Sequence, residues 1–125
     1  MPSFAIDPTD PTPIYAQLER RIRGAIATGK LPAGAQLPTV RQMAVDLAVN
    51  ANTVAKVYAQ LERERILETR RGVGTFVSDM TPPPVPKADR ERELRRIARR
   101  YIEEAAALGF TINELVKQLN KEERK

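Results

Sequence analysis

The sequence contains no histidine, no cysteine and no tryptophan. Without cysteine the chain has no disulfide framework and no thiol nucleophile, and without histidine it lacks the commonest general base and metal ligand. The acidic residues stand in charge-rich stretches such as "ERERILE" and "DRERELRR", where ion pairs along a helix surface account for them. The sequence therefore predicts a protein that is not an enzyme and that uses no metal and no cofactor.

Long apolar runs are also missing. No segment approaches the roughly 18 apolar residues that a membrane-spanning helix needs. The N-terminus, "MPSFAIDPTDPTP", lacks the basic segment and apolar stretch of a signal peptide. These features predict a cytoplasmic protein with no membrane partner.

The excess of positive charge is spread along the chain. A formal net charge of +5 favours a polyanionic partner. Residues 1–80 contain 10 Lys/Arg against 8 Asp/Glu, and residues 81–125 contain 11 against 8. Because neither part stands out, the position of individual residues must identify the binding surface.

Apolar residues at helical spacing predict three helices, over about residues 13–28, 40–47 and 51–64. Only the short turn "AVN" separates the second from the third, which is typical of a helix-turn-helix. The residues expected to face the core are Tyr15, Leu18, Ile22 and Ile26, then Val40, Met43, Ala44 and Leu47, then Val54, Val57, Tyr58 and Leu61, with Leu31 and Leu37 from the loop. The expected N-caps are Thr12, Thr39 and Asn50, and Gly29 is the expected stop of the first helix.

Residues 66–70 and 75–77 are rich in Ile, Thr, Phe and Val and flank "RGVG", which predicts a β-hairpin. Helix, helix-turn-helix and hairpin in this order describe a winged helix. The predicted fold class is therefore α+β, with a winged helix-turn-helix domain over residues 1–78. Four prolines in "SDMTPPPVPKA" predict a semi-rigid linker over residues 79–88.

A two-helix region is predicted over residues 89–125. Asp89 is the expected cap of a long helix that Gly109 ends, and "TINE" from Thr111 to Glu114 is a capping box that opens a second helix. Two narrow apolar stripes cannot enclose a core of their own, so they either pack on the winged helix or meet a second copy. The proline-rich linker favours the second copy, as a homodimer. The expected interface residues are Leu94, Ile97, Tyr101, Leu108, Ile112, Leu115 and Leu119.

The third predicted helix has a polar face opposite its apolar stripe. Asn52, Thr53 and Lys56 can all donate hydrogen bonds. On an isolated helix this face would be an ordinary solvated surface, but the N-terminal residues of the second helix in a helix-turn-helix reach base edges in the major groove. Arg41, on the outer side of the preceding helix, would lie beside the same DNA.

The predicted hairpin tip, "TRRGVGTF", has two interpretations. Its glycines could simply permit a tight turn. The two arginines that precede the turn, Arg70 and Arg71, also suit insertion of the tip into a narrow minor groove. The two interpretations are compatible with each other.

Residues 13–77 resemble the DNA-binding domain of the GntR family of bacterial transcriptional regulators, and the short tail resembles the YtrA-type branch, which has a small helical dimerisation region. Two positions depart from the family pattern. Ala55 stands where many relatives have arginine, which shifts base reading toward Asn52 and Lys56. Arg65 replaces a usual glycine and must adopt a left-handed conformation or shift the turn. The DNA-binding residues expected from the pattern and the resemblance are Thr39, Arg41, Asn50, Asn52, Thr53, Lys56, Arg70, Arg71, Gly72 and Gly74.

The sequence thus predicts a homodimeric repressor that binds a palindromic double-stranded DNA operator. The alternative from another class is a winged helix that docks on a protein, which would not need hydrogen-bond donors on the third helix. The operator sequence and the existence of a small-molecule effector stay open. The tail is too small to enclose a metabolite within one protomer.

Overall fold

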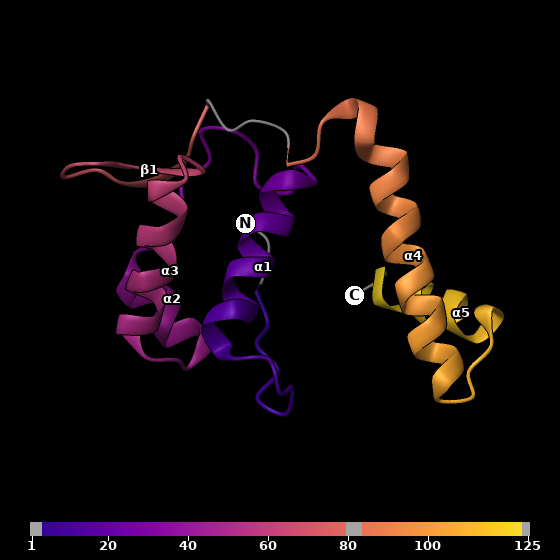
Figure 1. Cartoon of the computed structure of the whole chain (residues 1–125). Coiled ribbons are helices and arrows are strands. Elements are labelled where there is room, and N and C mark those ends of the chain that lie inside the picture. Colours follow the sequence, from indigo (N-terminus) through magenta and orange to yellow (C-terminus); the bar gives the residue numbers. More distant parts are fainter. Residues whose placement is uncertain (1–3, 80–83, 124–125) are drawn as a thin grey trace. The chain divides into compact units, whose positions relative to one another are not determined.

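The computed structural model describes residues 4–79 and 84–123 and divides the chain into two compact units, Met1–Pro84 and Val85–Lys125 (Figure 1). Of the predicted linker, residues 80–83 lie outside the described residues, and Lys87–Asp89 form the short 3₁₀ helix η1. No helix among the described residues is long and apolar enough to cross a membrane. The first unit contains α1 (Ile14–Ala27), α2 (Val40–Leu47), α3 (Ala51–Arg63), β1 (Leu67–Arg70) and β2 (Gly74–Val77), and the second contains η1, α4 (Arg90–Ala107) and α5 (Ile112–Glu123).

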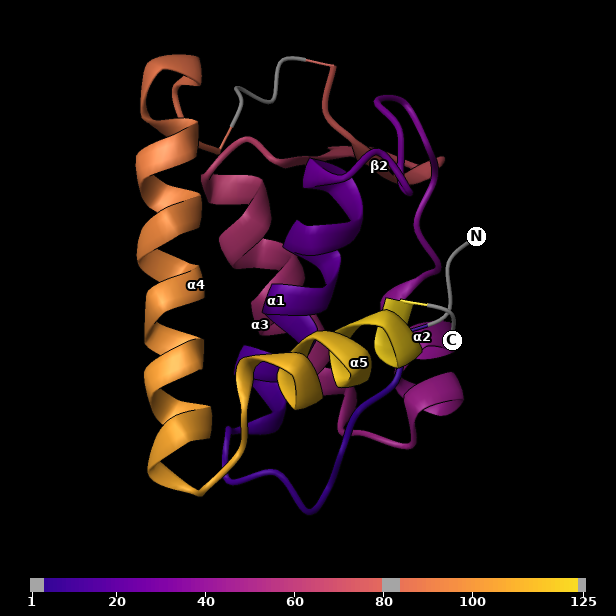
Figure 2. The ribbon, with the colours of Figure 1, turned by 90° about the vertical axis from the view of Figure 1, so that its right-hand side faces the viewer.

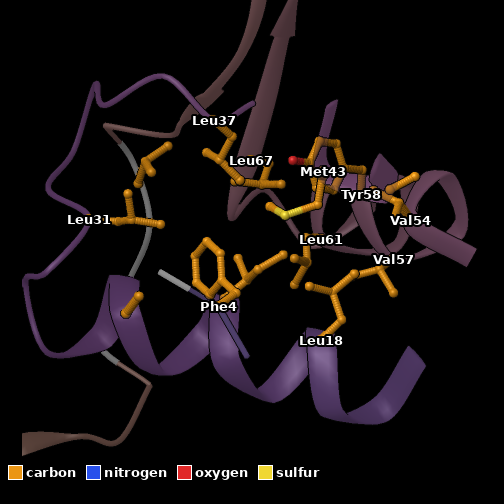
Figure 3. Packing of buried hydrophobic residues seen from close by; sticks show 14 residues of the cluster. Phe4, Leu18, Leu31, Leu37, Met43, Val54, Val57, Tyr58, Leu61 and Leu67 are labelled. Atoms are coloured by element: carbon orange, nitrogen blue, oxygen red, sulfur yellow. The ribbon is translucent and has the colours of Figure 1, made fainter. Parts of the chain in front are cut away.

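The core of the first unit lies between α1, α2, α3 and the base of the hairpin (Figure 3). Leu18 and Ile22 of α1 belong to this core together with Val54 and Leu61 of α3, and all four are fully buried. The predicted apolar stripes of α2 and α3 are confirmed, and Leu31 and Leu37 are buried as expected. The core also includes Phe4, Ala25, Leu67 and Val77.

The start of α1 differs from the prediction. Its N-cap residue is Pro13, not Thr12, and no side chain caps the helix. The buried side chain of Gln17 instead donates to the Thr12 carbonyl at 2.9 Å and bonds both the amide and the carbonyl of Asp7. Gln17 thus ties the N-terminal segment to α1, while Tyr15, expected in the core, is 56% exposed. Gly29 follows the helix with φ 82°, as predicted for its stop.

The helix-turn-helix is held by the predicted caps. Thr39 Oγ1 accepts a hydrogen bond from the Gln42 amide at 3.1 Å, and Asn50 Oδ1 accepts one from the Asn52 amide at 2.7 Å. Between them, Ala48 adopts a left-handed conformation with φ 55°, which ends α2 and turns the chain toward α3. These local bonds fix where α3 begins.

The hairpin projects from the helices of its unit (Figure 1). Its strands are antiparallel, with Leu67 opposite Val77 at the base and Arg70 opposite Gly74 near the tip. Arg65 adopts φ 61° just before β1, so it takes the left-handed conformation, which is one of the two outcomes expected from the sequence. The edge of β2 that faces away from β1 forms backbone hydrogen bonds of 2.8–2.9 Å with residues 34–37, and one of them runs from Leu37 N to Thr75 O. The segment that leads into α2 therefore anchors the hairpin.

The second unit is a pair of helices in which α5 leads away from the C-terminal end of α4 (Figure 2). Asp89 precedes α4, but its carboxylate accepts from Arg92 Nη2 at 2.6 Å and makes no cap bond, contrary to the prediction. The capping box is confirmed: Thr111 Oγ1 accepts from the Glu114 amide, and Glu114 Oε1 accepts from the Thr111 amide, both at 3.2 Å. Neither helix contains a buried residue.

Candidate nucleic-acid interface

The polar face of α3 lies opposite the side that packs in the core. Asn52 and Lys56 are exposed, and Thr53 is half-buried. Among the described residues the side chains of Asn52 and Lys56 have no hydrogen-bond or ion-pair partner. Asn50 uses its side-chain oxygen for the cap of α3, which leaves its NH₂ group as a donor. The first turns of α3 therefore present donor groups to solvent from a rigid, capped helix.

The start of α2 is positioned by a residue of α3. The buried Tyr58 hydroxyl donates to the Pro38 carbonyl at 2.8 Å, immediately before the Thr39 cap. Burial raises the pKa of Tyr58, so the hydroxyl stays protonated as a donor. Arg41, in the first turn of α2, is exposed and has no partner in the described part of the chain. Tyr58 thus connects the position of Arg41 to that of α3.

The two arginines of the hairpin have different environments. Arg70 Nε lies 3.1 Å from Glu68 Oε1, and its guanidinium carbon lies 4.2 Å from the centre of the Phe76 ring. Arg71 is exposed and, within residues 4–79 and 84–123, makes no hydrogen bond or ion pair. Arg70 is engaged inside the hairpin, whereas Arg71 is available to a ligand.

The hairpin tip is supported by a residue that the sequence pattern did not indicate. Gln36 Nε2 donates to the Val73 carbonyl at 3.3 Å. It lies so close to Gly74 that a Cβ placed there would be 2.6 Å from Nε2, and Gly74 also has φ 145°. Gly72 adopts φ 76° in the same turn, where Val73 N donates to Arg70 O at 2.9 Å. Both glycines are therefore needed for the shape of the tip.

An open groove of about 890 Å³ runs between α1 and α3. Tyr15 lines it together with Thr53 and Lys56 from the polar face of α3. At one end, Arg23 bridges Glu19 at 2.8 Å and Glu64 at 2.5 Å. The hydrogen bond from Arg23 lowers the pKa of Glu64, so this carboxylate stays charged and holds α1 to the end of α3.

The comparisons with known proteins agree with this geometry. Residues 14–77, from the start of α1 to the end of β2, match the family model of bacterial regulatory proteins of the gntR family. The chain belongs to the GntR family. Its hairpin is the wing of the GntR winged-helix DNA-binding fold, as the sequence predicted. GntR proteins are regulators and not enzymes, which also agrees with the prediction.

Two GntR relatives illustrate the match. The HTH-type transcriptional regulator Rv1152 of Mycobacterium tuberculosis is 38% identical over 107 residues, which cover 86% of this chain and 83% of the relative. The HTH-type transcriptional repressor YtrA of Bacillus subtilis is 45% identical over 74 residues, 59% of this chain and 57% of YtrA. The predicted resemblance to YtrA-type GntR regulators is therefore confirmed.

Solved GntR-like structures cover both units or the winged helix alone. The transcriptional antiterminator from Listeria monocytogenes EGD-e has a TM-score of 0.66 and 30% identity, and covers 98% of this chain and 90% of its own. The DNA-binding domain of AraR in complex with operator ORX1 has a TM-score of 0.53 and 27% identity, and covers 59% and 94%. The second match is a solved complex between a domain of similar fold and its operator DNA.

Proposed function

We propose that the chain is a homodimeric transcriptional repressor that binds a palindromic DNA operator, with α3 in the major groove and the wing at the minor groove. The observation that carries the proposal is the polar face of α3. Asn52 and Lys56 are exposed without partners among the described residues, at the start of the second helix of a helix-turn-helix, where base edges are read. The AraR domain, which binds operator ORX1 with this fold, supports it.

The environments of the side chains suggest a division of roles. The planar amide of Asn52 matches the hydrogen-bonding edge of adenine, so we assign base reading to Asn52 and assistance to Thr53. Lys56 and Arg41 are exposed cations suited to phosphates. Arg71 is the cation that the wing offers to the minor groove. The remaining expected contacts are Asn50, Thr39, Gly72 and Gly74, while Arg70 supports the wing from within.

The dimer is proposed from the apolar residues of α4 and α5. Leu94 is 68% exposed, Leu108 74% and Leu119 58%, and neither helix of this unit contains a buried residue. Large apolar side chains in such number favour a partner surface. A second copy suits a palindromic site, because two-fold protein symmetry mirrors the symmetry of the DNA. The proposed interface also includes Ile97, Tyr101, Ile112 and Leu115.

Repression is proposed by similarity to YtrA of Bacillus subtilis, which is named a repressor. A protein that occupies an operator can block transcription of the gene that the operator controls without catalysing any reaction. It would act in the cytoplasm.

Selection of bound sequences from a random DNA pool, with sedimentation of the protein and its complex, tests the proposal. We expect an inverted repeat and a complex of two protomers per duplex. If each protomer places Arg41, Lys56 and Arg71 at phosphates, these contacts in a dimer should contribute about −5 to the slope of the log–log dependence of affinity on salt. No enriched sequence and a salt slope near zero would instead favour the protein-docking alternative.

A further inference from the structure

The stretch from η1 to Arg100 of α4 carries a large share of the net positive charge of the chain. Residues 87–100 contain 7 Lys/Arg against 3 Asp/Glu, a net charge of +4, whereas the whole chain has a net charge of +5. Six of the seven are arginines, all of them in α4. Glu103 lies on the same side of α4 as five of these arginines, but the excess of positive charge there still favours a ligand of opposite charge.

Five of these arginines form one face of the helix, here called the arginine face. Helical spacing places them within less than half a turn of each other, on the side opposite Leu94, Ile97 and Tyr101. All five are exposed, so the apolar side of α4 remains available to a second copy while the arginine face meets solvent. The arginine face consists of Arg92, Arg95, Arg96, Arg99 and Arg100.

The internal partners of the arginine face are few and weak. Arg92, Arg95 and Arg96 pair with acids one helical turn back, at 2.6, 3.4 and 2.9 Å. Such exposed pairs contribute little, and a stronger anion can replace them. Arg99 and Arg100 have no ion-pair partner among the described residues. The face is therefore free to bind a polyanion.

We infer that the arginine face is a second DNA-binding surface, which contacts the phosphate backbone. The inference rests on the proposed function, because that function brings a duplex to the chain. Arginine rather than lysine fits, since the guanidinium group matches phosphate oxygens with two parallel hydrogen bonds. From Arg92 to Arg100 the helix rises about 12 Å, which corresponds to roughly three phosphates of one strand. These contacts add affinity and salt dependence but no sequence preference.

The test measures the affinity of the full chain for a duplex of random sequence, several helical turns long, at a series of salt concentrations. We expect Arg99→Gln/Arg100→Gln to reduce the steepness of the log–log salt dependence by about 1.8 per protomer, or about 0.9 for each phosphate that is no longer neutralised. Glutamine preserves helix propensity, so the helix should persist. Circular dichroism and sedimentation check that fold and assembly are unchanged.

Two further variants make the result specific. Lys117→Gln/Lys121→Gln removes the same charge from exposed positions of α5 and should leave the salt slope unchanged. Arg99→Lys/Arg100→Lys keeps the charge and should retain the slope. Equal slopes for wild type, the arginine-to-glutamine variant and the α5 control would overturn this inference and leave the proposed function intact. A wild-type protein that binds neither this duplex nor a selected operator would overturn both.

Discussion

The two neighbouring arginines of the wing should give opposite results when each is replaced by alanine. Arg70 is held by Glu68 at 3.1 Å and by the Phe76 ring at 4.2 Å, while Arg71 has no partner among the described residues. Arg70→Ala should therefore lower the stability of the fold. Arg71→Ala should leave stability unchanged and weaken DNA binding.

The magnitudes follow from the interactions that each arginine makes. The exposed cation–π interaction of Arg70 is worth about 0.5–1 kcal/mol, and its exposed ion pair about 0.2–1 kcal/mol. A decrease of about 1 kcal/mol in the free energy of unfolding corresponds to a Tm decrease of about 4–8 °C in a domain of this size. Arg71→Ala should shift Tm by less than this, since surface substitutions usually stay within about 0.5 kcal/mol.

Calorimetry and salt titration of DNA affinity, run on both variants, separate the two roles. Arg71→Ala should reduce the steepness of the salt dependence by about 0.9 per protomer. Its affinity should fall by a similar factor on selected and random duplexes. If Arg70→Ala left Tm unchanged and altered the salt slope as much as Arg71→Ala, the division of roles within the wing would be refuted.

Three other changes should have measurable effects. Tyr58→Phe removes the donor to the Pro38 carbonyl and should lower the free energy of unfolding by about 1 kcal/mol or more in denaturant titration, because the carbonyl loses its partner; unchanged stability would show that this bond does not hold the start of α2. Deletion of residues 85–125 should leave a folded, monomeric winged helix in sedimentation, and a dimeric remnant would contradict the assigned interface. Arg23 lowers the pKa of Glu64 in the folded state, so their interaction stabilises the fold at pH values above about 4.5, the usual pKa of this group, and the contribution is lost as pH falls through the lower folded-state pKa. The Tm of Glu64→Gln should therefore fall less than that of the wild type as the solution is made acidic. An equal fall of Tm in both proteins would show that the Arg23–Glu64 bridge does not contribute to the acid sensitivity.

Local sequence signals accounted for most of the winged helix. The caps Thr39 and Asn50 bond amides two or three residues away, and the stripe of α3 repeats at the spacing of a helix, so both follow from neighbouring residues alone. For Arg65 the sequence allowed either a left-handed conformation or a shifted turn, and the structure shows the left-handed conformation.

The features that were missed depend on side-chain contacts that helical and strand periodicity does not indicate. Gln36 reaches Val73 across 37 positions, so no local pattern indicates that it supports the wing. The sequence context does not separate Arg70 from Arg71, whereas in the structure the Glu68 carboxylate and the Phe76 ring both engage Arg70. At the start of α1, the side-chain amide of Gln17 donates hydrogen bonds to the carbonyls of Asp7 and Thr12. The prediction of Thr12 as the N-cap considered only the capping residue and did not anticipate these bonds.

In the proposed complex, Asn52 reads a base from the major groove. The most direct measurement compares wild type and Asn52→Ala on the selected operator and on a scrambled duplex of equal length, at several salt concentrations. Removing a bidentate base interaction should cost about 1–3 kcal/mol on the operator alone and abolish the preference at one symmetric pair of base positions. Tm should be unchanged, because the Asn52 side chain is exposed and has no partner in the described structure. Equal weakening on both duplexes would contradict the placement of α3 in the groove.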